Sequence, residues 1–224
     1  MSAMLASVNS LPEALLVKGF AVDIIDLKQP EQGALGALET ERVAEIVKAL
    51  APETLISATI GDMAMDPQPV FDAVQAMAAT GVDFVKIGLF PEGDTLATIQ
   101  QLAAIAQQGT ALIAVLFADA KPNFEILEAL AVAGFRGAML DTMHKSQGSL
   151  TEVLPLTVLN DFVERCANLG LLSGLAGSLR ESDITVLSPL NPDYLGFRGA
   201  LCQQQCRTAK LDRQQIARIR YLVK

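Results

Sequence analysis

The stretch Ile24-Ile25-Asp26-Leu27-Lys28-Gln29-Pro30 is the segment on which the interpretation of the whole chain depends. Apolar and ionisable residues alternate along it, and this period of two predicts a β-strand that places Asp26 and Lys28 on one face. Three later apolar runs end in the same way, with one ionisable residue and a turn. Their ionisable residues are Lys86, Asp141 and Arg198. Charges that recur at strand ends indicate a site, although each one alone could equally be a surface residue.

The composition favours a globular protein with a large aliphatic core. The chain has 224 residues, of which 51% are hydrophobic and 19% are charged, and it contains no Trp. We expect residues 1–224 to form one domain rather than two small ones. The net charge of −8 argues against nucleic acid as a partner, because nucleic-acid binding needs a basic surface. It does not exclude a phosphorylated small molecule, since a site can be locally basic.

The cysteine and histidine pattern does not predict a metal site. Cys166, Cys202 and Cys206 form no Cys-x-x-Cys pair, and the single histidine, His144, is distant in sequence. Cys202 and Cys206, four residues apart, could still ligate a metal or form a strained disulfide bridge. We expect no metal or cofactor, reduced thiols and a cytoplasmic location. Without a basic leader or an apolar run of about 20 residues, we expect neither a signal peptide nor a membrane span.

Short apolar runs alternate with longer segments of helical periodicity along the whole chain. Strands are predicted at 3–8, 24–28, 54–60, 83–89, 111–118, 137–142, 171–176 and 194–197. Helices are predicted at 12–18, 39–50, 67–80, 94–108, 123–132, 156–169, 181–187 and 211–223. Eight strand–helix units predict an α/β fold of the (β/α)₈ type, a TIM barrel. The alternative is an open doubly wound sheet, which would favour a Gly-x-Gly-x-x-Gly after the first strand, and the sequence has none there.

In a barrel of this kind the carboxyl ends of the strands carry the chemistry, and alternate strands contribute side chains to one interior layer. Lys28, Lys86, Asp141 and Arg198 would then converge from strands two, four, six and eight, with Asp26 just below Lys28. A lysine that is desolvated next to another cation has a lowered pKa, and its neutral amine can attack a carbonyl. The second lysine can act as acid or base. The structural alternative is that Lys28 and Lys86 simply pair with Asp26 and Asp141.

Two turns after the last strands are candidate anion sites. Gly177 and Ser178 follow the seventh strand, and Arg198 and Gly199 follow the eighth, where (β/α)₈ barrels commonly hold phosphate. The alternative is ordinary turn chemistry. 

Three more polar residues are candidates for the site or for a structural role. Asp119 and Asp62 follow the fifth and third strands, where each could orient a lysine or a substrate hydroxyl, or cap a helix. For Asp62 we favour the helix cap, whereas Asp119 is kept as a candidate substrate-binding residue. We expect His144, in a polar loop, to be a surface residue.

Several motifs resemble one known family in the same order along nearly the whole chain. They are Asp26-Leu27-Lys28-Gln29-Pro30, Ser57-Ala58-Thr59-Ile60-Gly61-Asp62, Phe84-Val85-Lys86-Ile87-Gly88, Gly137-Ala138-Met139-Leu140-Asp141-Thr142, Ala176-Gly177-Ser178-Leu179 and Phe197-Arg198-Gly199-Ala200. The family is that of (5-formylfuran-3-yl)methyl phosphate synthase, also called 4-HFC-P synthase, a lyase of methanofuran biosynthesis.

The resemblance implies a (β/α)₈ enzyme that joins two molecules of glyceraldehyde 3-phosphate with loss of phosphate and water. It implies that Lys28 forms a Schiff base and that Lys86 acts as general acid and base. It also implies that Asp26 and Asp141 tune or relay protons. Phosphate would be held by Gly177, Ser178, Arg198 and Gly199.

Two rival functions remain open. The chain could be another lysine Schiff-base aldolase acting on triose or sugar phosphates, because the layer argument does not separate such enzymes. It could also be a barrel that binds a phosphorylated ligand without turnover. Apolar-rich helix faces leave a homo-oligomer possible.

Overall fold

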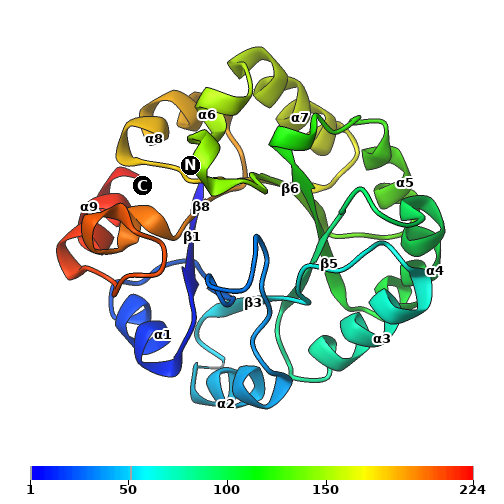
Figure 1. The fold of residues 1–224 in the computed structure, drawn as a ribbon, viewed down its shortest axis with the longest axis horizontal. Coiled ribbons are helices and arrows are strands. Elements are labelled where there is room, and N and C mark those ends of the chain that lie inside the picture. The colour runs from blue at the N-terminus through cyan, green and yellow to red at the C-terminus, as the bar shows by residue number, and fades with distance from the viewer. Residues whose placement is uncertain (1, 51, 224) are drawn as a thin grey trace.

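A computed structural model describes residues 2–50 and 52–223 and confirms the predicted barrel. Eight parallel strands pair in sequence order, and β1 pairs with both β2 and β8, so that the sheet closes (Figure 1). The strands are β1 (Ala3–Val8), β2 (Ile24–Leu27), β3 (Leu55–Thr59), β4 (Phe84–Gly88), β5 (Ala111–Phe117), β6 (Gly137–Asp141), β7 (Leu172–Leu175) and β8 (Tyr194–Phe197). Parallel pairing requires a crossover after each strand, and helices supply it.

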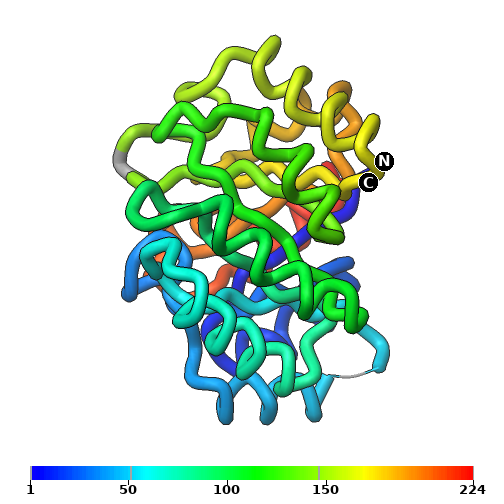
Figure 2. The backbone as a smooth tube through the Cα atoms, turned by 90° about the vertical axis from the view of Figure 1, so that its right-hand side faces the viewer, coloured from blue at the N-terminus to red at the C-terminus, as the bar shows by residue number. Residues whose placement is uncertain are grey.

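The helices form a ring outside the sheet (Figure 1). They are α1 (Leu11–Lys18), α2 (Thr40–Leu50), α3 (Pro67–Ala78), α4 (Thr95–Gln107), α5 (Ile126–Val132), α6 (Leu150–Val153), α7 (Leu156–Asn168), α8 (Glu181–Leu187) and α9 (Arg213–Leu222). Short 3₁₀ turns lie at η1 (Ala118–Ala120), η2 (Lys145–Gln147), η3 (Ser188–Leu190), η4 (Gly199–Leu201) and η5 (Gln203–Gln205). The two marked ends of the chain lie close together (Figure 2).

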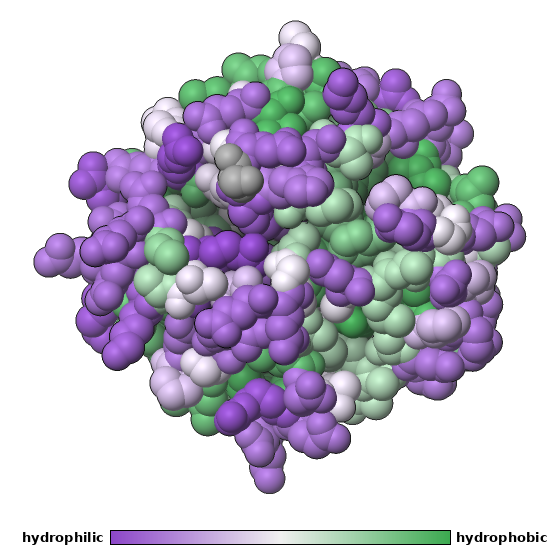
Figure 3. All heavy atoms as spheres, in the orientation of Figure 1, coloured by the Kyte–Doolittle hydropathy of each residue, from purple (hydrophilic) through white to green (hydrophobic). Residues whose placement is uncertain are grey.

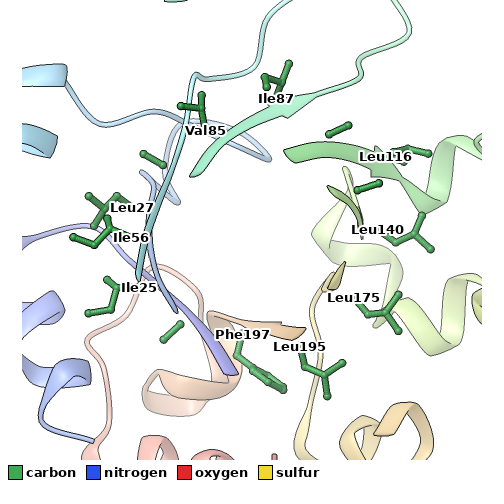
Figure 4. Packing of buried hydrophobic residues seen from close by; sticks show 14 of the residues in the cluster. Ile25, Leu27, Ile56, Val85, Ile87, Leu116, Leu140, Leu175, Leu195 and Phe197 are labelled. Carbon is green, nitrogen blue, oxygen red and sulfur yellow. The ribbon is translucent and has the colours of Figure 1, made fainter. Parts of the chain in front are cut away.

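The strand residues separate into an outer and an inner set, as the period of two requires. Ile25 and Leu27 point away from the centre of the barrel toward the helices (Figure 4), and both are fully buried. Burial of such a side chain contributes roughly 1.5–3 kcal/mol. Ile24 belongs to a second cluster that includes Met139 and Tyr194. Asp26, between Ile25 and Leu27, therefore points inward and is also fully buried.

The differences from the predicted elements are local. The predicted strand 24–28 ends at Leu27, and the predicted helix 211–223 begins at Arg213, because Asp212 accepts hydrogen bonds from the amides of Gln214 and Gln215. The short helix α6 was not predicted, since four residues carry too little periodicity. Within residues 2–50 and 52–223, no helix is both long enough and apolar enough for a membrane crossing.

Candidate active site

Asp26 on β2 is held by three donors, one each from β1, β3 and β4. Strand register places Ser7 of β1 and Ser57 of β3 directly beside Asp26. The Ser7 hydroxyl donates to Oδ2 at 2.8 Å, and the Ser57 hydroxyl donates to Oδ1 at 2.7 Å. Lys86 on β4 places its Nζ 2.7 Å from Oδ1, and both side chains of this ion pair are almost completely buried. The carboxylate is therefore immobilised from both sides.

The charge of Asp26 survives its burial. Desolvation alone would raise the pKa of this carboxyl, but the charges of Lys86 and Lys28 and the hydrogen bonds from Lys86 and Ser57 outweigh it, and the pKa is lowered. Asp26 is therefore a carboxylate at neutral pH. It gives the buried Lys86 the counter-charge that an ammonium needs in the protein interior.

Lys28 differs from Lys86 in having no partner of its own. Among the described residues, its Nζ takes part in no ion pair or side-chain hydrogen bond, although only 6% of the residue is exposed. The pKa of Lys28 is lowered to about 8, because burial, together with the charges of Lys145 and Lys86, outweighs the opposing effect of Asp141 and Asp26. Roughly a tenth of Lys28 is then a neutral amine at pH 7, against well under a thousandth for an ordinary lysine. A neutral amine is the form that attacks a carbonyl.

Asp141 at the end of β6 is paired with Lys145, a residue that sequence reasoning did not select. Lys145 Nζ lies 2.6 Å from Asp141 Oδ1 and also donates to the carbonyl oxygen of Thr142. Desolvation acts to raise the pKa of Asp141, but Lys145 and Lys28 outweigh it, so the pKa is lowered. The spacing of four residues between Asp141 and Lys145 is compatible with an ion pair. Because Lys145 lies in a loop, however, the spacing alone does not predict that the two side chains meet.

These groups surround a cavity of about 300 Å³ at the carboxyl ends of the strands. Its cationic lining residues are Lys28, Lys86, Lys145, Arg180, Arg198 and Arg207, and its acidic lining residue is Asp141. In the view of Figure 3, hydrophilic residues crowd the side of α8 and α9, and more hydrophobic residues lie on the side of β5 and α4. An acidic protein thus carries a strongly basic pocket, which suits an anionic ligand.

The turns after β7 and β8 present main-chain amides to this cavity. Gly177 has a φ of +105°, and a Cβ there would lie 2.9 Å from the amide nitrogen of Thr142, so the turn needs glycine. Ser178 follows in the left-handed region, with a φ of +49°. Among the hydrogen bonds of the described chain, none uses the amides of Ser178, Gly199 or Ala200 as a donor. Free amides in such turns form an anion-binding nest.

Arg198 lines the same cavity, but its guanidinium is occupied. Its five N–H donors serve the carboxylate of Glu13, at 2.5 and 3.3 Å, and three main-chain carbonyl groups. These carbonyl groups belong to Ser7, Arg207 and Ala209. The proposed contact between Arg198 and phosphate stays a prediction, and the observed contacts place the residue as a brace between α1, β1 and the β8–α9 loop.

Asp119 and Asp62 each anchor a loop. Asp119 accepts from the amides of Met143 and His144, at 2.8 and 2.7 Å, and therefore fixes the loop that carries Lys145. Asp62 accepts from the amides of Ala34 and Leu35, at 2.8 and 2.7 Å. The prediction that Asp62 caps the following helix is wrong, because its carboxylate serves the β2–α2 loop; the substrate role of Asp119 stays a prediction.

Among the described residues, neither His144 nor a cysteine lines the cavity. The His144 side chain is 62% exposed and pairs with Asp119, as expected for a surface residue. Burial raises the pKa of Cys166 to about 12 and that of Cys202 to about 11. In the described part of the chain, no three His, Cys, Asp or Glu residues are grouped as metal ligands would be. The expectation that the protein uses no metal or cofactor stays a prediction.

Comparison with solved structures supports the fold. Phosphoribosyl anthranilate isomerase from Thermus thermophilus matches with a TM-score of 0.70 and 13% identity, covering 100% of this chain and 98% of that one. 3-Hexulose-6-phosphate synthase from Salmonella typhimurium matches with a TM-score of 0.70 and 16% identity, over 99% and 98% of the two chains. At these identities the likeness concerns the barrel alone.

Comparison of sequences goes further. A protein of Methylorubrum extorquens is 42% identical, over 96% of this chain and 88% of its own length, and is provisionally named (5-formylfuran-3-yl)methyl phosphate synthase. The (5-formylfuran-3-yl)methyl phosphate synthase of Methanopyrus kandleri is 33% identical, over 96% and 95%. The family model described as 4-HFC-P synthase matches residues 4–220. The match includes Lys28, Lys86 and Lys145, and the chain therefore belongs to the 4-HFC-P synthase family of enzymes.

Proposed function

We propose that this protein condenses two molecules of glyceraldehyde 3-phosphate into (5-formylfuran-3-yl)methyl phosphate, for methanofuran biosynthesis, through a Schiff base on Lys28. The observation that carries the proposal is the unpaired, desolvated amine of Lys28 at a basic cavity, beside the ion pair of Lys86 with Asp26. The names of the related proteins support the same product. 

The first steps use the two lysines differently. The Lys28 amine attacks the carbonyl carbon of one triose phosphate, and loss of water gives an iminium. The iminium withdraws electrons, so that a proton on the neighbouring carbon becomes acidic, and the resulting enamine adds to the aldehyde of the second molecule. Lys86 would deliver or remove the protons that these steps require, and its ion pair with Asp26 supports this role.

The later steps remove the leaving groups. Phosphate leaves by β-elimination, and ring closure with dehydration gives the aromatic furan. Hydrolysis of the iminium releases the product as an aldehyde and returns Lys28 to the free amine. The overall balance is two triose phosphates giving one furan aldehyde phosphate, one inorganic phosphate and two water molecules. The free amides after β7 and β8 would hold a phosphate during this sequence, and Asp141 with Lys145 would relay protons near Lys28.

The test is incubation with glyceraldehyde 3-phosphate alone, with and without borohydride. Borohydride should fix one triose adduct on Lys28, located by peptide mass spectrometry, and Lys28→Met should abolish it. Without borohydride, inorganic phosphate and near-ultraviolet absorbance should rise together. A wild-type protein that forms no adduct and releases no phosphate would rule the proposal out.

The rival aldolase reaction is separated by its product. An aldol product keeps both phosphates and has no furan absorbance, so carbon–carbon bond formation without phosphate release would favour it. A barrel that only binds its ligand would show a thermal shift with no turnover, and Lys86→Met would leave that shift unchanged. Self-association and a cytoplasmic location stay predictions.

A further inference from the structure

Arg207, in the loop between β8 and α9, crosses to another loop at the mouth of the cavity. Its Nη2 donates to the carbonyl oxygen of Gly33, in the loop between β2 and α2, at 2.8 Å. The residue lines the cavity that contains Lys28 and Lys86. Among the hydrogen bonds of the described chain, its Nε and Nη1 donate to nothing. Arg207 therefore brings free guanidinium N–H groups to the pocket.

Both ends of Arg207 are fixed by independent contacts. Its main-chain carbonyl accepts from Arg198 Nε at 2.8 Å, and Arg198 is itself held by Glu13. On the other side, the β2–α2 loop that presents Gly33 is fastened to Asp62. Gly33 has a φ of +96°, and a Cβ at this position would lie 2.1 Å from Asp62 Oδ2. The guanidinium is therefore held in place before any ligand arrives.

Its chemistry suits a phosphate. A planar guanidinium forms paired, charge-assisted hydrogen bonds with phosphate oxygens and keeps its charge at all working pH values. Arg198 has all of its donors engaged, and Arg180 has a side chain that is 51% exposed and paired with Glu152. Of the three arginines that line the cavity, Arg207 is the one that combines a fixed position with free donors.

We propose that Arg207 is a substrate-binding residue, whose free N–H groups take a phosphate of the triose phosphate in the cavity. This inference rests on the proposed function, because that function supplies the substrate. Two substrate phosphates, each with about −1.5 to −2 charges at pH 7, must be held in one pocket. Arg207 supplies a full positive charge in addition to the amides that follow β7 and β8.

The experiment compares a substrate that has a phosphate with one that lacks it. Borohydride trapping on Lys28 is measured against concentration for glyceraldehyde 3-phosphate and for glyceraldehyde, in wild type, Arg207→Met and Arg207→Lys. For Arg207→Met the half-saturating concentration of the phosphorylated substrate should rise about 10- to 100-fold, with that of glyceraldehyde changed less than twofold. Arg207→Lys should be intermediate, since it keeps the charge and loses the paired geometry.

The control is Arg165→Met, which removes an arginine from an exposed pair with Asp161 on α7 and should change neither substrate. An equal loss for both substrates in Arg207→Met would show a structural role for the strap between the loops and overturn the inference. No change for either substrate would also overturn it. 

If the proposed function itself is wrong, the wild-type protein will form a borohydride adduct with neither glyceraldehyde 3-phosphate nor glyceraldehyde. In that case inorganic phosphate serves as the probe. Thermal stabilisation by phosphate that is weakened in Arg207→Met, and kept in Arg165→Met, would support the anion site. Stabilisation that is equal in all three proteins would refute it.

Discussion

Asp141 accepts its short contact from Lys145, at 2.6 Å, and not from Lys28. The two aspartates therefore do not neutralise both Lys28 and Lys86: Asp26 pairs with Lys86, whereas Asp141 pairs with Lys145. Lys145 pairs with the carboxylate of Asp141, which would otherwise be available to Lys28. Its positive charge also lowers the pKa of Lys28. The reactivity we propose for Lys28 follows from this competition.

The pH dependence of adduct formation should report the pKa of Lys28. With a pKa of about 8, the borohydride trapping rate should rise about tenfold per pH unit below that value and level off above it. Lys145→Gln removes a like charge and leaves Asp141 facing Lys28, and both changes raise the pKa of Lys28. The midpoint of the profile should therefore move to higher pH. Lys48→Gln, an exposed change on α2, serves as control; an unmoved midpoint in Lys145→Gln would contradict the coupling.

Lys28→Met should stabilise the fold. The pKa of Lys28 lies below its unfolded value of 10.5, so folding at neutral pH opposes the protonation that the unfolded chain prefers. The resulting loss in the free energy of unfolding is complete below about pH 8 and disappears as the pH rises through 10.5. Its upper bound is about 3 kcal/mol. Urea unfolding at pH 7 should show a gain of about 1–3 kcal/mol for Lys28→Met, which narrows at pH 10. A loss of stability at pH 7 would show that Lys28 is paired after all.

Asp26→Asn should destabilise the protein strongly. Lys86 would lose the counter-charge 2.7 Å from its Nζ while both side chains remain buried. Removal of one partner from a buried ion pair typically costs about 3–5 kcal/mol. The free energy of unfolding from urea denaturation measures the effect, with exposed Asp72→Asn on α3 as control. A change below about 1 kcal/mol in Asp26→Asn would mean that Ser7 and Ser57 alone satisfy the site.

Asp119→Asn should loosen the loop that carries Lys145. An amide side chain cannot accept both main-chain N–H groups as the carboxylate does. Hydrogen exchange at the amides of Met143 and His144 should become faster, and adduct formation at Lys28 should fall because Lys145 is no longer positioned. Asp161→Asn, on the exposed face of α7, should change neither measurement. Unchanged exchange at both amides would argue against the anchoring role.

The fold could be predicted because strand periodicity is local in sequence. Asp26 lies between Ile25 and Leu27, and this alternation alone sends the carboxylate into the barrel. Lys145 and Arg207 could not be found in the same way, since both lie in loops, where position depends on anchors from elsewhere in the chain. For Arg198, the sequence predicts the position at a strand end but not the ion pair with Glu13, which is distant in sequence.

Two loops at the mouth of the cavity are each held by an aspartate that follows a neighbouring strand. Asp62, which follows β3, secures the loop after β2, and Asp119, which follows β5, secures the loop after β6. A single loop transplanted here from a related barrel would therefore lack the aspartate on the adjacent loop that holds it in place. Engineering of new substrate preferences should exchange adjacent loops in pairs, and natural divergence at this rim is expected to have moved in the same paired steps.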